Sequence, residues 1–266
     1  MSQRFIVTKE HRRFTEFADA VRRGHTIGLC FGSAGVGKTL SARRYAHYEK
    51  AHDLLTYWGP RSDNDAKIYA ALNRSRTVLY TPSVLTTPRT LKDELTQAIT
   101  RTNMCIEQHL VPPGTATPEA WGWRHGRNYV ELIIVDEAHK MSAYRTGERA
   151  KKTYKTRLYK LGEELSARTK HFLLLSATPH KGDPEHFRLL LELLDKDLFA
   201  DRTILEENMK SQDNPIILRR LKEEMCRFDG SPLFPERTVK TVTFRLSPEE
   251  RDLYEEVTAY VSDHFN

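Results

Sequence analysis

The sequence predicts an α/β fold, a doubly wound and mainly parallel sheet with helices on both faces. Short apolar segments at residues 26–31, 77–81, 130–139 and 171–178 alternate with segments in which apolar residues recur every three or four positions. The last two segments are almost continuously apolar until they end in polar residues, which is typical of strands buried on both faces of a parallel sheet. In such folds the ligand binds at the carboxyl ends of the strands.

Length and composition indicate one main core with a small appendage. The 266 residues have an ordinary hydrophobic content of 39%, which is enough for one large core. A formal net charge of +6 and a pI near 9.1 predict attraction to polyanions, although so mild an excess is more often a solvated surface.

The cysteines and the apolar runs exclude two other classes of protein. Cys30, Cys105 and Cys226 lie far apart without the spacing that zinc sites use, so we expect reduced, mostly buried thiols. No apolar run approaches a membrane span, and the N-terminal residues lack the apolar core of a signal peptide. We therefore expect a cytoplasmic protein.

Four helices are expected in the first half of the chain. An amphipathic helix over residues 10–23 follows Thr8 as a cap, and a second helix follows the glycine-rich loop. A short helix is expected around residues 66–72. Thr87 and Pro88 begin another helix, with threonine as the cap and proline at the first helical position.

The second half is expected to hold further helices. Residues 151–168 read as a basic helix whose inner face carries Tyr154, Leu158, Leu161 and Leu165. Two apolar helices, FRLLLELLD and PIILRRLKEEM, are expected next, followed by the alternating segment VKTVTFRL, in which Val242, Phe244 and Leu246 share one face, and a capping box at residues 247–250 that opens a terminal helix. We expect a core over residues 1–200 and a helical and strand extension over residues 201–266.

The glycine-rich loop carries the clearest chemistry. Residues 32–39, GSAGVGKT, match the phosphate-binding pattern G-x-x-x-x-G-K-[ST] between a predicted strand and a predicted helix, which argues against a chance match. Glycines let backbone N–H groups converge on phosphate oxygens, while Lys38 would neutralise the β and γ phosphates and Thr39 would bind Mg²⁺. The expected ATP-contacting residues are Gly32, Ser33, Ala34, Gly35, Val36, Gly37, Lys38, Thr39 and Leu40.

Acidic and polar residues end the later strands. Asp136 would hold Mg²⁺ and Glu137 would orient the attacking water, on a strand expected to lie beside the loop. His139 is interpreted either as a relay of the nucleotide state or as an ordinary surface residue. Ser176 and Thr178 would sense the γ phosphate, or would only shape the turn before Pro179.

From Asp136 onward the chain resembles the first motor lobe of Swi/Snf-type superfamily 2 DNA helicases. The resemblance rests on DEAHKM, LLLSATPHKGDPEHFRLLLELLD, PIILRRLKEEM and LFPERTVKTVTFRLSPEERDLYEEV. It implies that Asp136, Glu137 and His139 form the DEAH box. It also implies that hydrolysis is coupled to DNA by Ser176, Ala177, Thr178, Arg219 and Arg220.

Residues 1 to about 130 instead resemble AAA-type ATPases that accompany bacterial transposases. The likeness rests on residues 5–46 and on VLYTPSVLTTPR. The two resemblances therefore meet close to the acidic pair, and both imply a P-loop NTPase core of the RecA-like or AAA-like kind. A single sheet can form across the junction because both families have compatible strand arrangements.

Three functions follow from these observations. The first is an ATP-hydrolysing motor lobe of a Swi/Snf-like DNA translocase, incomplete without a second lobe. Because that lobe would supply the arginine finger, we expect slow hydrolysis and no processive unwinding by this chain alone. The second is an AAA-type ATPase that assembles on DNA, regulates a transposase and borrows its finger from a neighbouring copy. The third is a truncated product that binds ATP without catalysis.

Two segments are candidates for contact with DNA, most simply duplex DNA. Residues 145–160 are rich in Lys and Arg with tyrosines at 144, 154 and 159, and residues 121–127 combine tryptophans with arginines. Basic groups would hold phosphates and the aromatic rings would stack on bases. A solvated helix face is the more common explanation for such a basic run.

Overall fold

The computed structural model describes the greater part of the chain in two units, Met1–Phe234 and Pro235–Asn266. The described residues are 7–24, 26–57, 62–82, 87–110, 128–141, 143–146, 152–168, 171–177, 184–195, 199, 216–227, 229–236, 238–241, 243 and 245–265.

The first unit is built on a five-stranded parallel sheet, which confirms the predicted fold class. Its strand order is β2-β3-β6-β1-β7. The strands are β1 (Ile27–Gly32), β2 (Thr77–Tyr80), β3 (Leu132–Val135), β6 (Phe172–Ser176) and β7 (Ile217–Arg220). The central strand is β6, and β1 lies between β6 and the edge strand β7.

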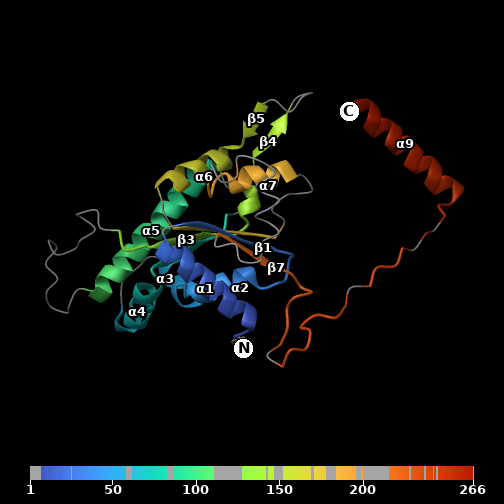
Figure 1. Ribbon diagram of the computed structural model, residues 1–266. Coiled ribbons are helices and arrows are strands. Elements are labelled where there is room, and N and C mark those ends of the chain that lie inside the picture. Colours follow the sequence, from blue (N-terminus) through green and yellow to red (C-terminus); the bar gives the residue numbers. More distant parts are fainter. Residues whose placement is uncertain are drawn as a thin grey trace. The chain divides into compact units, whose positions relative to one another are not determined.

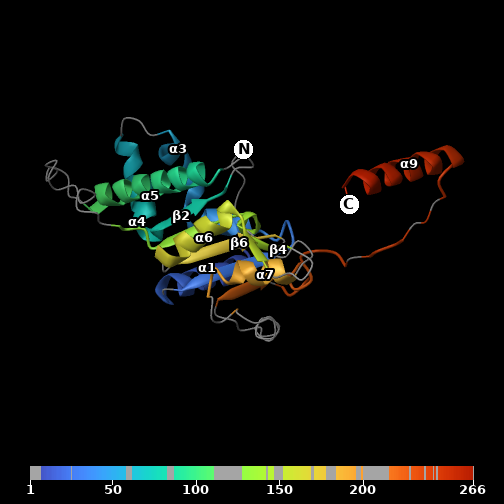
Figure 2. The ribbon, with the colours of Figure 1, turned by 90° about the horizontal axis from the view of Figure 1, so that it is seen from above.

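Helices cover both faces of this sheet (Figure 1). They are α1 (Lys9–Gly24), α2 (Lys38–Tyr45), α3 (Tyr48–Thr56), α4 (Ala66–Ser75), α5 (Pro88–Leu110), α6 (Arg157–Arg168) and α7 (Pro184–Leu191). Figure 1 shows α1 and α2 below the strands and α6 and α7 above them, and Figure 2 looks down on the α6 and α7 side. Two single turns, η1 (Asp63–Asp65) and η3 (Ala138–Lys140), and a hairpin of β4 (Ala143–Thr146) and β5 (Lys152–Lys155) complete the described elements of this unit.

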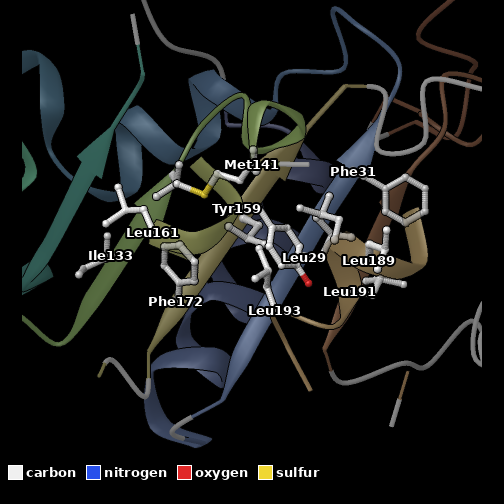
Figure 3. Close-up of a cluster of buried hydrophobic side chains, with 14 of the residues drawn as sticks. Leu29, Phe31, Ile133, Met141, Tyr159, Leu161, Phe172, Leu189, Leu191 and Leu193 are labelled. Atoms are coloured by element: carbon white, nitrogen blue, oxygen red, sulfur yellow. The ribbon is translucent and has the colours of Figure 1, made fainter. Parts of the chain in front are cut away.

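Alternate residues of each strand enter different cores, because side chains point to opposite faces of a sheet. Leu29 and Phe172 join a cluster with α5, α6 and α7, and Figure 3 shows part of it, including Ile133, Tyr159 and Leu161. Their neighbours Cys30 and Leu173 face the other side and pack with α1 and α2. Both faces of these strands are therefore buried, which explains why their sequences are almost continuously apolar.

The predicted helix starts and thiols agree with the structure. Thr8 Oγ1 accepts from His11 N at 3.1 Å, and Thr87 Oγ1 accepts from Thr90 N at 3.2 Å. Ser247 and Glu250 exchange the two hydrogen bonds of a capping box at the start of α9 (Pro248–Phe265), in the second unit. Cys30 and Cys105 are buried, and Cys226 is half-buried.

The expected helix over residues 151–168 is wrong at its start. Residues 152–155 form β5, which pairs antiparallel with β4, and α6 begins only at Arg157. Thr156 Oγ1 accepts from Tyr159 N at 3.1 Å and so caps the helix there. Tyr154, expected to face inward, is 55% exposed.

The expected helix PIILRRLKEEM is also wrong, because its centre is β7. Ile217 joins the core beside α7, whereas Leu218 joins the core beside α1. This alternation belongs to a strand, and pairing with β1 supplies the backbone hydrogen bonds that a helix would have made internally. The sheet therefore includes a strand from the segment that the sequence assigned to the extension.

In the remaining segments, FRLLLELLD is helical up to Leu191. Val242 and Phe244 lie outside the described residues, and the described residues around them form no strand.

Candidate nucleotide-binding site

The glycine-rich loop joins β1 to α2 in a backbone shape that needs its glycines. Gly35 and Gly37 have φ values of 82° and 75°, in the left-handed region that favours glycine. Gly32 has φ 156°, and a Cβ placed on it would lie 2.0 Å from the carbonyl oxygen of Arg220. Residues 33–35 are exposed at the tip of the loop, whereas Val36 is buried. The loop is thus anchored at both ends and open in the middle.

Lys38 lies back across this loop. Its Nζ donates to the carbonyl oxygen of Gly32 at 2.7 Å and to that of Ser33 at 3.0 Å. Burial lowers the pKa of Lys38, and the carboxylates of Asp136 and Glu137 act in the opposite direction. The acidic pair therefore lies within electrostatic reach of the loop lysine.

Asp136 and Glu137 follow β3 and differ in their surroundings. Asp136 is 4% exposed, its N–H donates to Tyr80 O at 2.9 Å, and its Oδ1 accepts from Glu137 N at 3.0 Å. The backbone of Glu137 is left-handed with φ 53°, and its side chain is 40% exposed. His139 Nδ1 lies 3.2 Å from Glu137 Oε2. One carboxylate is thus held inside and the next is turned toward solvent, an arrangement that suits a metal ligand beside a base.

From the sequence, the strand of the acidic pair was expected to lie beside the loop. In the structure, this strand, β3, is not the direct neighbour of β1, the strand that leads into the loop. β6 is inserted between β3 and β1, and it pairs with both. Because all three strands are parallel, their carboxyl ends still meet at one edge of the sheet.

The end of β6 brings Ser176 to the same edge. Ser176 is opposite Phe31 of β1 in the strand register and is 1% exposed. Its Oγ has no hydrogen-bond partner within the described part of the chain. Ala177 follows in a bend, and Thr178 lies outside the described residues.

The two arginines of β7 occupy opposite environments. Arg219 is exposed, whereas Arg220 is 2% exposed beneath the loop. The Nη1 of Arg220 donates to Ser41 Oγ of α2 at 3.2 Å, and its Nε lies 3.7 Å from Glu10 Oε2 of α1. Arg220 therefore ties the loop helix to the first helix, while Arg219 is exposed to solvent.

Comparison with known protein families matches residues 21–200 to the AAA domain. The chain belongs to the AAA domain family. The match covers most of the chain and includes the loop, the acidic pair and Ser176. The AAA likeness that the sequence suggested for its first part is thus confirmed, and it continues beyond residue 130. The protein is a P-loop ATPase domain that binds ATP.

Two known bacterial proteins are similar to this chain over about half of its length. A potential ATP-binding protein of Staphylococcus aureus is 29% identical over 148 residues, which are 53% of this chain and 51% of that protein. An uncharacterized ATP-dependent helicase of Bacillus subtilis, YqhH, is 29% identical over 141 residues, which are 48% of this chain and 22% of that protein. The chain thus spans about half of the first relative and less than a quarter of the second.

Thr39 and Asp136 fit a magnesium ion that is held mainly by phosphate oxygens. Both offer the oxygen ligands that Mg²⁺ prefers, Thr39 from the first turn of α2 and Asp136 from the end of β3. Within the described ranges, no group of three or more His, Cys, Asp or Glu residues could hold a metal ion by itself.

The segments expected to contact DNA are described only in part. Residues 121–127, and residues 147–151 of the basic run, lie outside the described residues. In the basic run, Lys155 Nζ pairs with Glu163 at 2.8 Å and Tyr159 is 1% exposed, so neither offers a free group for DNA. The described parts of the run belong to both strands of the hairpin and to the start of α6 rather than to a single helix face.

Sequence reasoning missed Glu10 and Ser41 as supports of the site. Glu10 carried a signal, because it precedes Phe14 and Phe17 on the buried face of the first helix, where an acid needs a partner. Ser41 carried no signal, since serine is common on helix surfaces.

In the part of the chain that the structure describes, no helix is long and apolar enough to cross a membrane.

Proposed function

We propose that this AAA domain hydrolyses ATP and couples the hydrolysis to DNA, as the motor lobe of a Swi/Snf-like translocase. The observation that carries the catalytic part is the division of labour in the acidic pair. Asp136 is buried, Glu137 is half-exposed, and both act electrostatically on Lys38 of the loop. This arrangement supports metal binding by the first acid and activation of water by the second.

Each residue of the site has one role in this proposal. The loop N–H groups and the α2 N-terminus bind phosphate oxygens, and Lys38 leaves the carbonyl oxygens of Gly32 and Ser33 to neutralise phosphate charge. Glu137 accepts the proton of the attacking water, and His139 holds the Glu137 carboxylate on its other side. Bound Mg²⁺ would supply charge neutralisation next to Thr39 and Asp136.

Coupling to DNA is supported by four observations. One relative is named an ATP-dependent helicase, and the Swi/Snf resemblance includes DEAHKM and PIILRRLKEEM. The chain has a formal net charge of +6. Ser176 has a buried hydroxyl without a partner at the edge where a γ phosphate would lie, which suits a group that responds to the nucleotide state.

The second candidate is an AAA-type ATPase that assembles on DNA and regulates a transposase. It is favoured by the AAA match, because this match continues through DEAHKM and LLLSATPHKGDPEHFRLLLELLD, two of the segments that also resemble Swi/Snf proteins. In this case a neighbouring copy would supply the arginine finger, so ATP would produce oligomers on DNA. Sedimentation with and without ATP and duplex DNA separates the candidates, since a chain that stays monomeric in all conditions contradicts assembly.

The test of the proposed function is steady-state ATP hydrolysis with and without duplex DNA. We expect DNA to stimulate hydrolysis, Lys38→Ala to abolish ATP binding, and Glu137→Gln to keep ATP binding while turnover falls by about 10² to 10⁴. An unchanged rate in Glu137→Gln would remove that residue from the mechanism. ATP binding without turnover would leave a nucleotide-binding domain that is not catalytic by itself.

A further inference from the structure

We infer that Lys222 is a second cation for the phosphates of the bound nucleotide, acting from outside the glycine-rich loop. The inference rests on the proposed binding of ATP at this loop. Neither the loop pattern nor the acidic pair includes this residue, because it follows β7, far from both in the sequence.

The position of Lys222 is set by the pairing of β7 with β1. Arg220 is the last residue of β7 and lies opposite Gly32, the last residue of β1. The segment that follows β7 therefore begins beside the first residue of the glycine-rich loop. Two residues later, Lys222 Nζ lies 3.9 Å from the place that a Cβ on Gly35 would occupy. Gly35 is exposed, so the ammonium group lies at the open tip of the loop.

Three cations surround the loop, and only Lys222 is without a polar partner in the described residues. Lys38 donates to two loop carbonyls, and Arg220 is held by Ser41 and Glu10. Lys222 instead lies over the ring of Phe234, with Nζ 5.5 Å from the ring centre. An ammonium group over a ring keeps its hydrogen-bond donors available for an anion.

A short hairpin holds the ring in place. Leu233 N donates to Met225 O at 2.7 Å, and Arg227 N donates to Ser231 O at 2.8 Å. Met225 is 5% exposed, so this hairpin is anchored in the first unit, and Phe234 follows it directly. The ring therefore limits the positions that the flexible Lys222 side chain can take, which reduces the entropy lost when it binds a phosphate.

The chemistry of this position favours a triphosphate over a diphosphate. The loop offers its N–H groups and Lys38 to the phosphates, and Lys222 would add a charge at the exposed tip beside Gly35. A third phosphate adds negative charge that ADP lacks. Since the cation comes from the same chain, its contribution does not need a neighbouring copy or DNA.

The experiment measures equilibrium binding of a slowly hydrolysed ATP analogue and of ADP, both with Mg²⁺ and without DNA. We expect Lys222→Ala to weaken binding of the analogue about tenfold, the loss of about one charge-assisted hydrogen bond, and to weaken ADP binding about twofold or less. Lys222→Arg should restore most of the affinity. Phe234→Ala should weaken analogue binding in the same direction, by about threefold.

The matched control is Lys67→Ala, which removes one exposed charge from α4 and should change neither affinity. Thermal unfolding of Lys222→Ala should match that of the wild type. The inference is overturned if Lys222→Ala binds the analogue as the wild type does, or if it loses analogue and ADP equally. Lys38→Ala distinguishes failure of this inference from failure of the proposed function. If Lys38→Ala loses nucleotide binding and Lys222→Ala does not, ATP binding at the loop is supported and the role of Lys222 is rejected. A wild-type chain that binds no nucleotide would reject both.

Discussion

Glu10 and Arg220 form a buried ion pair, with Oε2 and Nε 3.7 Å apart and side chains 5% and 2% exposed. Glu10 comes from the first turn of α1, and Arg220 is the last residue of β7. Arg220 also donates to Ser41, one turn after the lysine of the loop. Residues from the two ends of the first unit thus meet beneath the phosphate-binding loop, and the support of this loop depends on both.

The first prediction concerns this pair. Glu10→Ala should lower the free energy of unfolding by about 3 kcal/mol, because it leaves the Arg220 charge buried without its acid. Urea titration followed by circular dichroism gives the value. The matched control is Glu16→Ala, an exposed acid on the same helix, which should change stability by less than about 0.5 kcal/mol. Equal effects of the two substitutions would show that the buried pair has no special role.

A second prediction separates a steric requirement for glycine from a conformational one. Gly32→Ala places a Cβ 2.0 Å from the Arg220 carbonyl oxygen, so β1 and β7 must move apart. We expect a loss of more than about 3 kcal/mol in the free energy of unfolding, together with loss of ATP binding. Gly230→Ala is the comparison, since Gly230 has φ 86° but open space around it, and it should cost about 1–2 kcal/mol with ATP binding retained. Similar losses in both variants would contradict the close approach at Gly32.

Ser176 gives a third prediction, in which function and stability separate. Its buried Oγ has no partner among the described residues, so Ser176→Ala removes no hydrogen bond and should leave stability equal or higher by up to about 1 kcal/mol. If Ser176 couples hydrolysis to DNA, the same variant should lose most of the stimulation by duplex DNA while its basal turnover stays close to that of the wild type. Full stimulation in Ser176→Ala would remove this residue from the coupling segment.

The fourth prediction is a dependence of stability on pH that involves His47. Burial lowers the pKa of His47 below its usual 6.5, and the charges of Lys50, Arg74 and Arg44 add to the effect. The unfolded chain therefore binds the proton more readily, and His47 makes the free energy of unfolding fall as the pH drops below about 6.5. His47→Asn removes this titrating group and should make the fall less steep. Asparagine is chosen because it tolerates the left-handed backbone with φ 53°. Urea titrations of both proteins between about pH 5 and 7.5 compare the slopes, and identical slopes would contradict the prediction.

Much of the fold and the centre of the site are predictable because they depend on local patterns. The segments 130–139 and 171–178 are almost continuously apolar and contain β3 and β6, and Thr8, Thr87 and Ser247 mark helix starts through their own hydrogen bonds. The order of the strands was not predictable at the same level. A parallel strand pairs with a partner distant in sequence, and the insertion of β6 between β1 and β3 leaves no mark in either strand.

The sequence by itself determined that an α/β domain carries a phosphate-binding loop and an acidic pair, since glycine, lysine and carboxylate positions follow from what a nucleotide phosphate requires nearby. Only the tertiary structure decided that residues 217–220 form a strand, that Arg220 meets Glu10, and that Lys222 lies beside Gly35. The physical reason is that four residues have too little local preference to choose between helix and strand. Their conformation comes from hydrogen bonds to β1 and from the two cores that Ile217 and Leu218 enter, and these contacts exist only once the sheet has formed.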